Sequence, residues 1–252
     1  MHKLVLVTPD LQEPYEDRRS VDAVLKFASD HKWDHWIDLG DRLDFDFISR
    51  FSYGIPRLVA EKSFQRQYEY SNKSLDRWVQ AVRCKNKKAK ISQIEGNHDA
   101  RVEHYIDKTP ESEGILEVPT QLHLKERKID WIPFATKGKT LRLGKATFLH
   151  GLYANEYHAK KHVLRYMTSV FYGHVHDLQS YSLVKQSKHT PIVGQSLGCL
   201  CDLEQEWMKG RPHNWQQGFG VFWFEPGGHF SYYVIRIINH KFRCPWGKAY
   251  SG

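Results

Sequence analysis

The sequence lacks any apolar run that approaches the ~20 residues a helix needs to cross a bilayer. Its first apolar stretch, residues 4–7, is too short for a secretory signal and leads directly to Asp10. Internal repeats and low-complexity segments are also absent, which argues against solenoid and disordered architectures. We therefore expect a globular protein of the cytoplasm without a membrane partner.

Cysteine is scarce as well. The chain has four cysteines, Cys84, Cys199, Cys201 and Cys244, and they do not form the paired CxxC spacing of a structural zinc site. We expect them to be reduced residues that pack inside the protein, as is usual in a reducing compartment.

The composition is that of an ordinary folded protein. With 252 residues, 40% of them hydrophobic and 13% aromatic, the chain is long enough to bury a substantial core. We expect one α/β domain over residues 1–252 in preference to two small domains. Lys and Arg number 37 against 29 Asp and Glu, a formal charge of +8. A basic surface favours polyanionic partners such as nucleic acid, although many basic proteins have no such partner.

Short apolar runs alternate with helical periodicity along the chain. The pattern predicts strands at residues 3–8, 33–39, 90–95, 128–133, 139–143, 145–149, 169–172, 178–185, 191–196, 218–225 and 230–238. It predicts helices at 18–31, across most of 42–84 with a break at 54–56, at 99–107 and at 155–167. We expect an α/β fold with two sheets packed face to face and helices outside.

Five of the predicted strands end in residue types that bind metals. These blocks are Asp10-Leu11-Gln12, Gly40-Asp41-Arg42-Leu43-Asp44, Gly96-Asn97-His98-Asp99, His150-Gly151 and Gly173-His174-Val175-His176. Asp10 and Asp41 are separated by the length of a strand–helix–strand unit, which places both carboxylates at the carboxyl ends of neighbouring parallel strands. Ligands of open α/β sheets bind at that edge.

These residue types suit a site for two divalent ions that acts on phosphate esters. A carboxylate such as Asp41 can bridge two cations, because it has about four lone-pair sites. His174 and His176 can reach different ions, and Asn97 can offer a neutral oxygen. We expect His98 to lie near the leaving group as a general acid, with Asp99 orienting its imidazole.

The set and its order resemble the calcineurin-like metallophosphoesterase superfamily, whose blocks are DxH, GDxxD, GNHD/E, a histidine before a small residue, and GHxH. The resemblance implies a four-layer α/β/β/α sandwich of two mixed sheets and hydrolysis by a metal-bridging hydroxide. It implies one ion held by Asp10, Gln12, Asp41 and His176, and a second held by Asp41, Asn97, His150 and His174. His98 would be the proton donor and Asp44 a supporting acid. Compact members of the family include viral ones, so a phage-encoded member acting in the host cytoplasm is one expectation.

Gln12 departs from the family pattern, which has a histidine at this place. A carboxamide oxygen is a harder and weaker donor than imidazole. We therefore expect a loosely bound first ion and a preference for manganese, with magnesium, iron, zinc or nickel as alternatives.

Three regions are candidates for contact with a substrate. The first is the break before residue 60, the second is the helix after His98, and the third is a possible lip at 198–218. The candidate residues are Arg50, Tyr53, Arg57, Arg101, Trp207, Arg211, His213 and Trp215. His158 and His162 lie four apart on a predicted helix; we interpret them as part of a basic exposed face, with an accessory site as the alternative.

The favoured function is that of a metal-dependent phosphodiesterase or nuclease acting on nucleic acid or nucleotides. A phosphomonoesterase for proteins or small molecules is the alternative, and an interaction scaffold that has lost its metals is a third hypothesis. The sequence indicates no oligomeric state.

Overall fold

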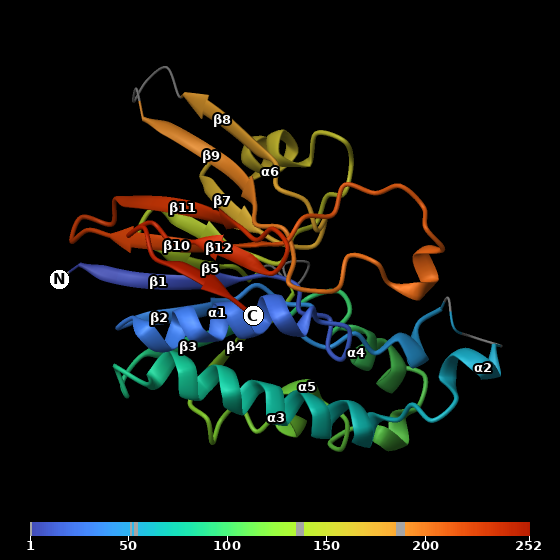
Figure 1. Cartoon of the computed structure of the whole chain (residues 1–252). Helices are drawn as coiled ribbons and strands as arrows, with labels where there is room; N and C mark the ends of the chain where they lie inside the picture. Colours follow the sequence, from blue (N-terminus) through green and yellow to red (C-terminus); the bar gives the residue numbers. More distant parts are fainter. Residues whose placement is uncertain (1, 51, 53–54, 135–138, 185–189) are drawn as a thin grey trace.

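The fold has two mixed β-sheets at its centre (Figure 1). The computed structural model describes all residues except 1, 51, 53–54, 135–138 and 185–189, and it leaves out the side chains of residues 57, 58 and 206. The first sheet has the order β11-β10-β1-β2-β3-β4. Its strands are β1 (Lys3–Thr8), β2 (His35–Asp38), β3 (Lys90–Ile94), β4 (Ile129–Ile132), β10 (Gly218–Phe224) and β11 (Phe230–Arg236). Strands β1 to β4 are parallel; β10 pairs antiparallel with β1, and β11 pairs antiparallel with β10.

The second sheet is smaller and has the order β5-β6-β7-β9-β8. Its strands are β5 (Leu141–Leu143), β6 (Ala146–Phe148), β7 (Ser169–Tyr172), β8 (Ser180–Val184) and β9 (Pro191–Ser196). The three central strands are parallel and the two edge strands are antiparallel to their neighbours. A separate hairpin of β12 (Lys241–Arg243) and β13 (Ala249–Ser251) packs against α1.

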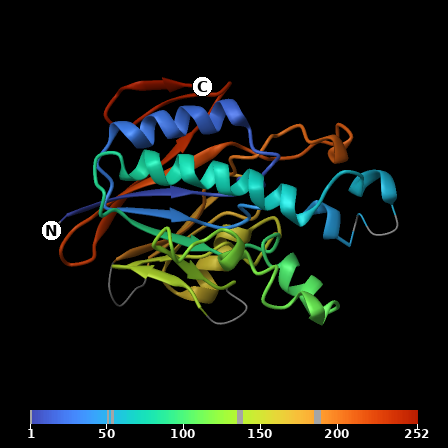
Figure 2. The ribbon, with the colours of Figure 1, turned by 90° about the horizontal axis from the view of Figure 1, so that it is seen from below.

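Helices cover the outer face of each sheet. On the first sheet α1 (Arg18–Asp30) and α3 (Phe64–Arg83) lie side by side, as Figure 2 shows. On the second sheet α6 (His158–Tyr166) packs against β7 and β9. Shorter elements are α2 (Pro56–Val59), α4 (Arg101–Ile106), α5 (Val118–Gln121) and the 3-10 turns η1 (Asp46–Ile48), η2 (Pro110–Ser112) and η4 (Glu206–Met208). The predicted four-layer α/β/β/α sandwich is confirmed.

Alternation along the strands produces this layering, because successive side chains of a strand point to opposite faces. Val5 and Val7 of β1 face the second sheet and pack in a core that includes Phe171. Trp36 of β2 faces outward, where its ring stacks on Trp78 of α3 at 5.1 Å between centroids. The polar residues of the five blocks come after these buried strands, in the loops that follow them.

The prediction of a mostly helical 42–84 is wrong at its start. Residues 42–45 form an irregular segment, η1 and α2 are short, and α3 begins only at Phe64 after the N-cap Ser63. The interpretation of His158 and His162 as exposed is also wrong. His158 is buried against the Tyr172 hydroxyl and Asp177, and His162 stacks on the Tyr172 ring. The basic residues Lys160, Lys161 and Arg165 of α6 are exposed.

Candidate metal centre

The loops that follow β1, β2, β3, β6 and β7 meet at one edge of the two sheets. Glycine allows these loops to approach one another closely. A Cβ on Gly40 would lie 2.6 Å from the Gly96 nitrogen, and one on Gly173 would lie 1.9 Å from Asp10 Oδ2. Five candidate ligands have positive φ angles: Asp10, Gln12, Asp41, His174 and His176. Left-handed backbone at a residue other than glycine costs of order 1–3 kcal/mol and clusters at functional sites.

The first group of candidate ligands surrounds His176. Its Nε2 lies 3.2 Å from Asp10 Oδ1 and 3.2 Å from Gln12 Nε2. The backbone N–H of His174 donates to the Asp10 carboxylate at 3.0 Å, which fixes the carboxylate between the loops after β1 and β7. Asp10, Gln12 and His176 are buried.

The second group surrounds His150. Its Nε2 lies 3.2 Å from Asp41 Oδ2 and 2.9 Å from Asn97 Oδ1, and its Nδ1 lies 3.0 Å from the Leu39 carbonyl oxygen. The ring of His174 is 5.1 Å from that of His150 between centroids. Ligand atoms of Asp41, His150 and His174 all lie within 4.8 Å of one another.

The donor set fits divalent ions. Bonds of ~2.1 Å to one ion place its ligand atoms roughly 3.0–3.4 Å apart, which is close to the separations in both groups. The Leu39 carbonyl can only accept a proton, so Nδ1 of His150 donates to it and Nε2 is free to be a ligand. Oxygens of Asp41 and Asn97 converge on Nε2, which is therefore the nitrogen that a cation would bind in place of a proton.

Charges in the centre shift the acid–base equilibria strongly. Burial acts to lower the pKa of His150, but the charge of Asp41 outweighs burial and raises the pKa to about 9. Burial acts to raise the pKa of Asp41, but His150 and His98 hold it well below its usual range. Burial and the neighbouring His150 lower the pKa of His174 to about 4, so this imidazole is neutral and can donate its lone pair.

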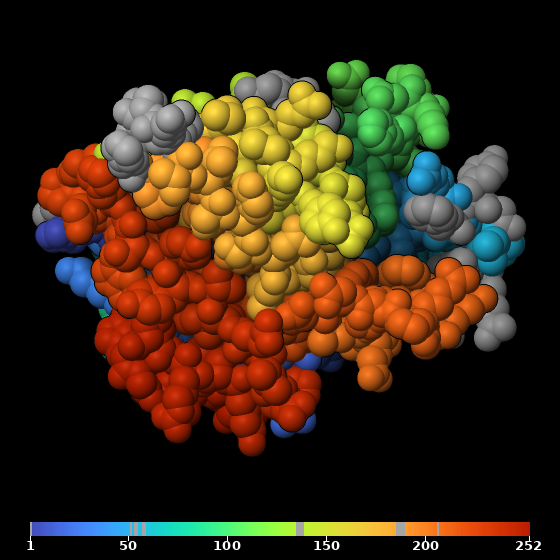
Figure 3. Space-filling view, turned by 90° about the horizontal axis from the view of Figure 1, so that it is seen from above, coloured from blue at the N-terminus to red at the C-terminus, as the bar shows by residue number. Residues whose placement is uncertain are grey.

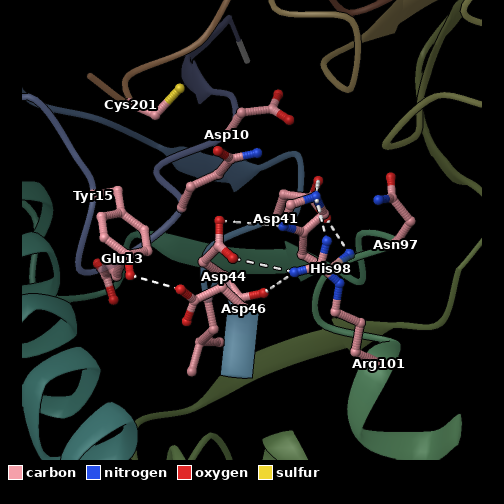
Figure 4. Close-up of polar contacts among 12 residues, drawn as sticks. Asp10, Glu13, Tyr15, Asp41, Asp44, Asp46, Asn97, His98, Arg101 and Cys201 are labelled. Atoms are coloured by element: carbon pink, nitrogen blue, oxygen red, sulfur yellow. Dashed lines mark hydrogen bonds and ion pairs between the residues drawn. The ribbon is translucent and has the colours of Figure 1, made fainter. Parts of the chain in front are cut away.

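His98 lies beside the second group and is held by two side chains (Figure 4). Its Nδ1 is 3.4 Å from Asp44 Oδ2, and Arg101 Nη2 donates to its Nε2 at 3.1 Å. Burial acts to lower the pKa of His98, but the charges of Asp41 and Asp44 raise it overall. Arg101 also donates to the Asp44 carboxylate at 3.1 Å, so the three side chains form one cluster.

The sequence predicts that Asp99 orients the imidazole of His98, but Asp44 contacts this imidazole instead. The Asp99 carboxylate accepts from the backbone N–H groups of Asp41, Leu43 and Gly96 at 2.9, 3.1 and 2.9 Å. Asp99 therefore ties the loop after β2 to the loop after β3. The Asp99 carboxylate points away from the neighbouring His98 because the backbone turn leaves three N–H groups that need an acceptor, and the carboxylate accepts from all three.

Within the segment 198–218, Trp207 and residues 209–214 are exposed and belong to a ridge, orange in Figure 3, whereas Cys199, Leu200 and Cys201 are buried. The Trp215 ring is 4.1 Å from the His176 ring and 5.9 Å from the Trp207 ring. Trp207 is 64% exposed, and its indole donates to Gln205 Oε1 at 2.7 Å. Gln205 donates in turn to Gln12 Oε1 at 3.2 Å, so the ridge is connected to the metal centre.

The other candidate substrate contacts are less close to the centre. Arg211 and His213 are exposed, and His213 packs against Trp215 at 5.5 Å between rings. Arg50 is exposed; Tyr53 and the side chain of Arg57 lie outside the described part of the chain.

Sequence reasoning missed a buried ion cluster beneath the centre. Arg42 is fully buried, with its guanidinium 2.7 Å from Glu13 and 2.8 Å from Asp38. Burial raises the pKa of Glu13 to about 7, although the Arg42 charge opposes this shift. The cluster holds the loops after β1 and β2 together. A charged residue such as Arg42 is usually exposed, so the sequence predicts a surface position for it. The apolar neighbours Trp36 and Leu39 are the one local sign that this segment is buried.

The structure brings the five blocks that carry the sequence resemblance together at one edge of the two sheets. No family model matches the sequence. It is 25% identical over 258 residues to the Gene 54 protein of Mycobacterium phage D29, and 24% identical over 252 residues to that of Mycobacterium phage L5, with 96% of each chain covered.

Solved structures also align with the chain. Vps29 of Chaetomium thermophilum aligns with a TM-score of 0.48 at 11% identity, covering 99% of this chain and 96% of that one. Vps29 of Entamoeba histolytica aligns with a TM-score of 0.47 at 10% identity, covering 99% of each chain. The nuclease MPE of Pseudomonas putida aligns with a TM-score of 0.37 at 13% identity, covering 92% of this chain and 86% of that one. Within the described residues, the longest helices are too polar or too short to span a bilayer.

Proposed function

We propose that this chain hydrolyses phosphate esters with two divalent ions, and that its substrates are phosphodiesters of nucleic acid or nucleotides. The observation that carries the proposal is the convergence of six side chains from five separate strand ends. They are Asp10, Asp41, Asn97, His150, His174 and His176. With Gln12 they would hold the ions, for which we favour manganese.

The bound ions would supply Lewis acidity that activates water and polarises the phosphoryl group. The protein's own contribution is to hold the ligands rigidly and to place a proton donor beside them. His98 would protonate the leaving oxygen, and the nearby Asp44 stabilises its charged form.

Arg101 is suited to a second task. In this structure its guanidinium donates to His98 Nε2 and therefore blocks the nitrogen that faces Asp41. An anionic substrate would draw the guanidinium to its phosphate, which frees Nε2 to take up a proton from water; the imidazolium, stabilised by Asp44, could then donate that proton to the leaving oxygen. Arg101 thus acts as a positioning residue for His98 and as a cationic contact for the substrate.

The ridge supports a diester substrate over a monoester. The exposed Trp207 ring and the half-buried Trp215 ring next to His176 offer stacking surfaces within reach of the metal centre. Base–aromatic stacking contributes about 1–3 kcal/mol per base and tolerates any sequence. The net charge of +8 and the exposed cations of α6 would attract the rest of a polyanionic chain.

Paired assays test the proposal. Bis-p-nitrophenyl phosphate and p-nitrophenyl phosphate are offered to the chain with manganese and with chelator. We expect manganese-dependent cleavage of the diester, abolished by Asp41→Asn. At saturating manganese we expect Trp207→Ala to raise KM for single-stranded DNA and to leave cleavage of the nitrophenyl diester unaffected. Faster cleavage of the monoester would favour a phosphatase, and no cleavage with any metal would favour a scaffold.

The similarity to two phage proteins supports a phage-encoded enzyme that works in the host cytoplasm. We propose that residues 1–252 act as a single catalytic domain, with the ridge at 198–218 as its substrate lip.

A further inference from the structure

Two thiols lie on the far side of the His176 imidazole from the metal centre. Nε2 of His176 faces Asp10 and Gln12, whereas its Nδ1 is 3.8 Å from Cys201 Sγ. A ligand nitrogen of His176 and the sulfur atoms of Cys199 and Cys201 all lie within 4.8 Å of one another. All three residues are buried, and neither cysteine is in a disulfide.

The backbone explains why both thiols reach the same histidine. The Leu200 N–H donates to the Asp10 carbonyl, and the Gly218 N–H donates to the Cys199 carbonyl, so residues 199–201 are held between the β1 loop and β10. The chain bends at Leu200, whose side chain packs in the outer core. Cys199 and Cys201, on either side of the bend, both place their sulfur atoms next to His176.

The surroundings of these thiols are polar, unlike those of packing cysteines. Cys199 Sγ lies 3.7 Å from the Gln216 carbonyl oxygen, Cys201 Sγ lies on the Asp10 side of the centre in Figure 4, and the Trp215 ring covers His176. One imidazole nitrogen and two thiolates are the ligands that zinc, cadmium and other thiophilic ions prefer, whereas the main centre is rich in oxygen.

We propose that His176, Cys199 and Cys201 form a third cation site, which takes a single thiophilic ion such as zinc or cadmium. Zinc bonds of about 2.1 Å to nitrogen and 2.3 Å to sulfur place ligand atoms roughly 3.3–3.8 Å apart. The Cys201–His176 separation already lies at the upper end of this range. Binding would release one proton from each thiol to solvent. The site shares His176 with the first ion position, so the two ions compete for one imidazole.

Cadmium provides a readout that needs no catalysis. The full chain is stripped of metal under reductant and titrated with cadmium alone, while thiolate-to-cadmium charge-transfer absorption is followed. We expect one tightly bound equivalent with a charge-transfer band, and X-ray absorption at the cadmium edge should count two sulfur ligands. Cys199→Ser and Cys201→Ser should each weaken binding by more than about tenfold. Saturating manganese should weaken cadmium binding in the wild-type protein.

Cys244→Ser and Cys84→Ser are the matched controls, one for a buried and one for an exposed thiol. A band that survives in both Cys199 and Cys201 variants, or that disappears in either control, overturns the proposal. Sulfur counting on the wild-type protein decides the matter if a variant misfolds, since fewer than two sulfur ligands also overturns it. A protein that binds cadmium in this way but cleaves no phosphate ester would refute only the proposed function.

Discussion

The contact of Asp99 with three backbone amides allows a quantitative prediction for Asp99→Asn. Hydrogen bonds to a charged group contribute about 1.5–3 kcal/mol each, and the carboxylate accepts three. The asparagine oxygen can keep the two donors Asp41 and Gly96, but its NH2 group would face the buried N–H of Leu43. Burial and the Asp41 charge raise the pKa of Asp99 to about 7, so the cost of ionisation offsets part of the gain. We expect a loss of about 2–4 kcal/mol at pH 8.

Urea unfolding at pH 8 and thermal melting measure this loss directly. A loss of that size in a chain of this length lowers Tm by roughly 5–15 °C. Manganese binding should weaken as well, because the loops that carry Asp41 and Asn97 are no longer tied together. Asp107→Asn, at a side chain that is 78% exposed, is the control and should change stability by less than about 0.5 kcal/mol. An equally small change for Asp99→Asn would refute the role assigned to its carboxylate.

Three further outcomes are expected. Asp44→Asn removes a charge that raises the pKa of His98, so the alkaline limb of the kcat–pH profile should move to lower pH; an unmoved limb would contradict proton donation by His98. Burial, aided by the Lys90 charge, lowers the pKa of His35 to about 3, so the unfolded chain binds its proton first as pH falls below 6.5. Wild-type stability should drop by about 2 kcal/mol more than that of His35→Gln between pH 6 and 4.5, and parallel unfolding curves would argue against this. Gln12→His should tighten the first ion and shift activation toward zinc; unchanged stoichiometry and metal preference would show that Gln12 is not a ligand.

The strand-end residues were predictable because each follows an apolar strand within a few positions. Asp10, Asp41 and His176 come from distant parts of the chain, yet parallel strands place their carboxyl ends at one edge. The strands themselves were predictable because apolar runs of four to six residues between turns are too short for most helices.

The remainder depended on contacts that no local pattern contains. The start of the stretch predicted as helical does not form a helix, because the buried acids Glu13 and Asp38 hold the Arg42 guanidinium and residues 42–45 are irregular. The hairpin at 241–251 was missed because each of its strands is only three residues long, and it owes its place to packing on α1. The partner of His98 was misassigned because backbone turns, and not sequence proximity, decide where Asp99 points.

The hydrogen bonds from Trp207 to Gln205 and from Gln205 to Gln12 imply that Trp207 weakens the binding of the first ion. An indole nitrogen can only donate, so Trp207 fixes the oxygen of Gln205, and the Gln205 NH2 group then fixes the oxygen of Gln12. The Gln12 NH2 group is left facing His176, where it cannot bind a cation. Trp207→Phe removes the donor and lets both amides rotate, so manganese should bind the first position more tightly. Calorimetric titration of that variant against wild type measures the difference, and equal or weaker binding would break the chain of reasoning at Gln12.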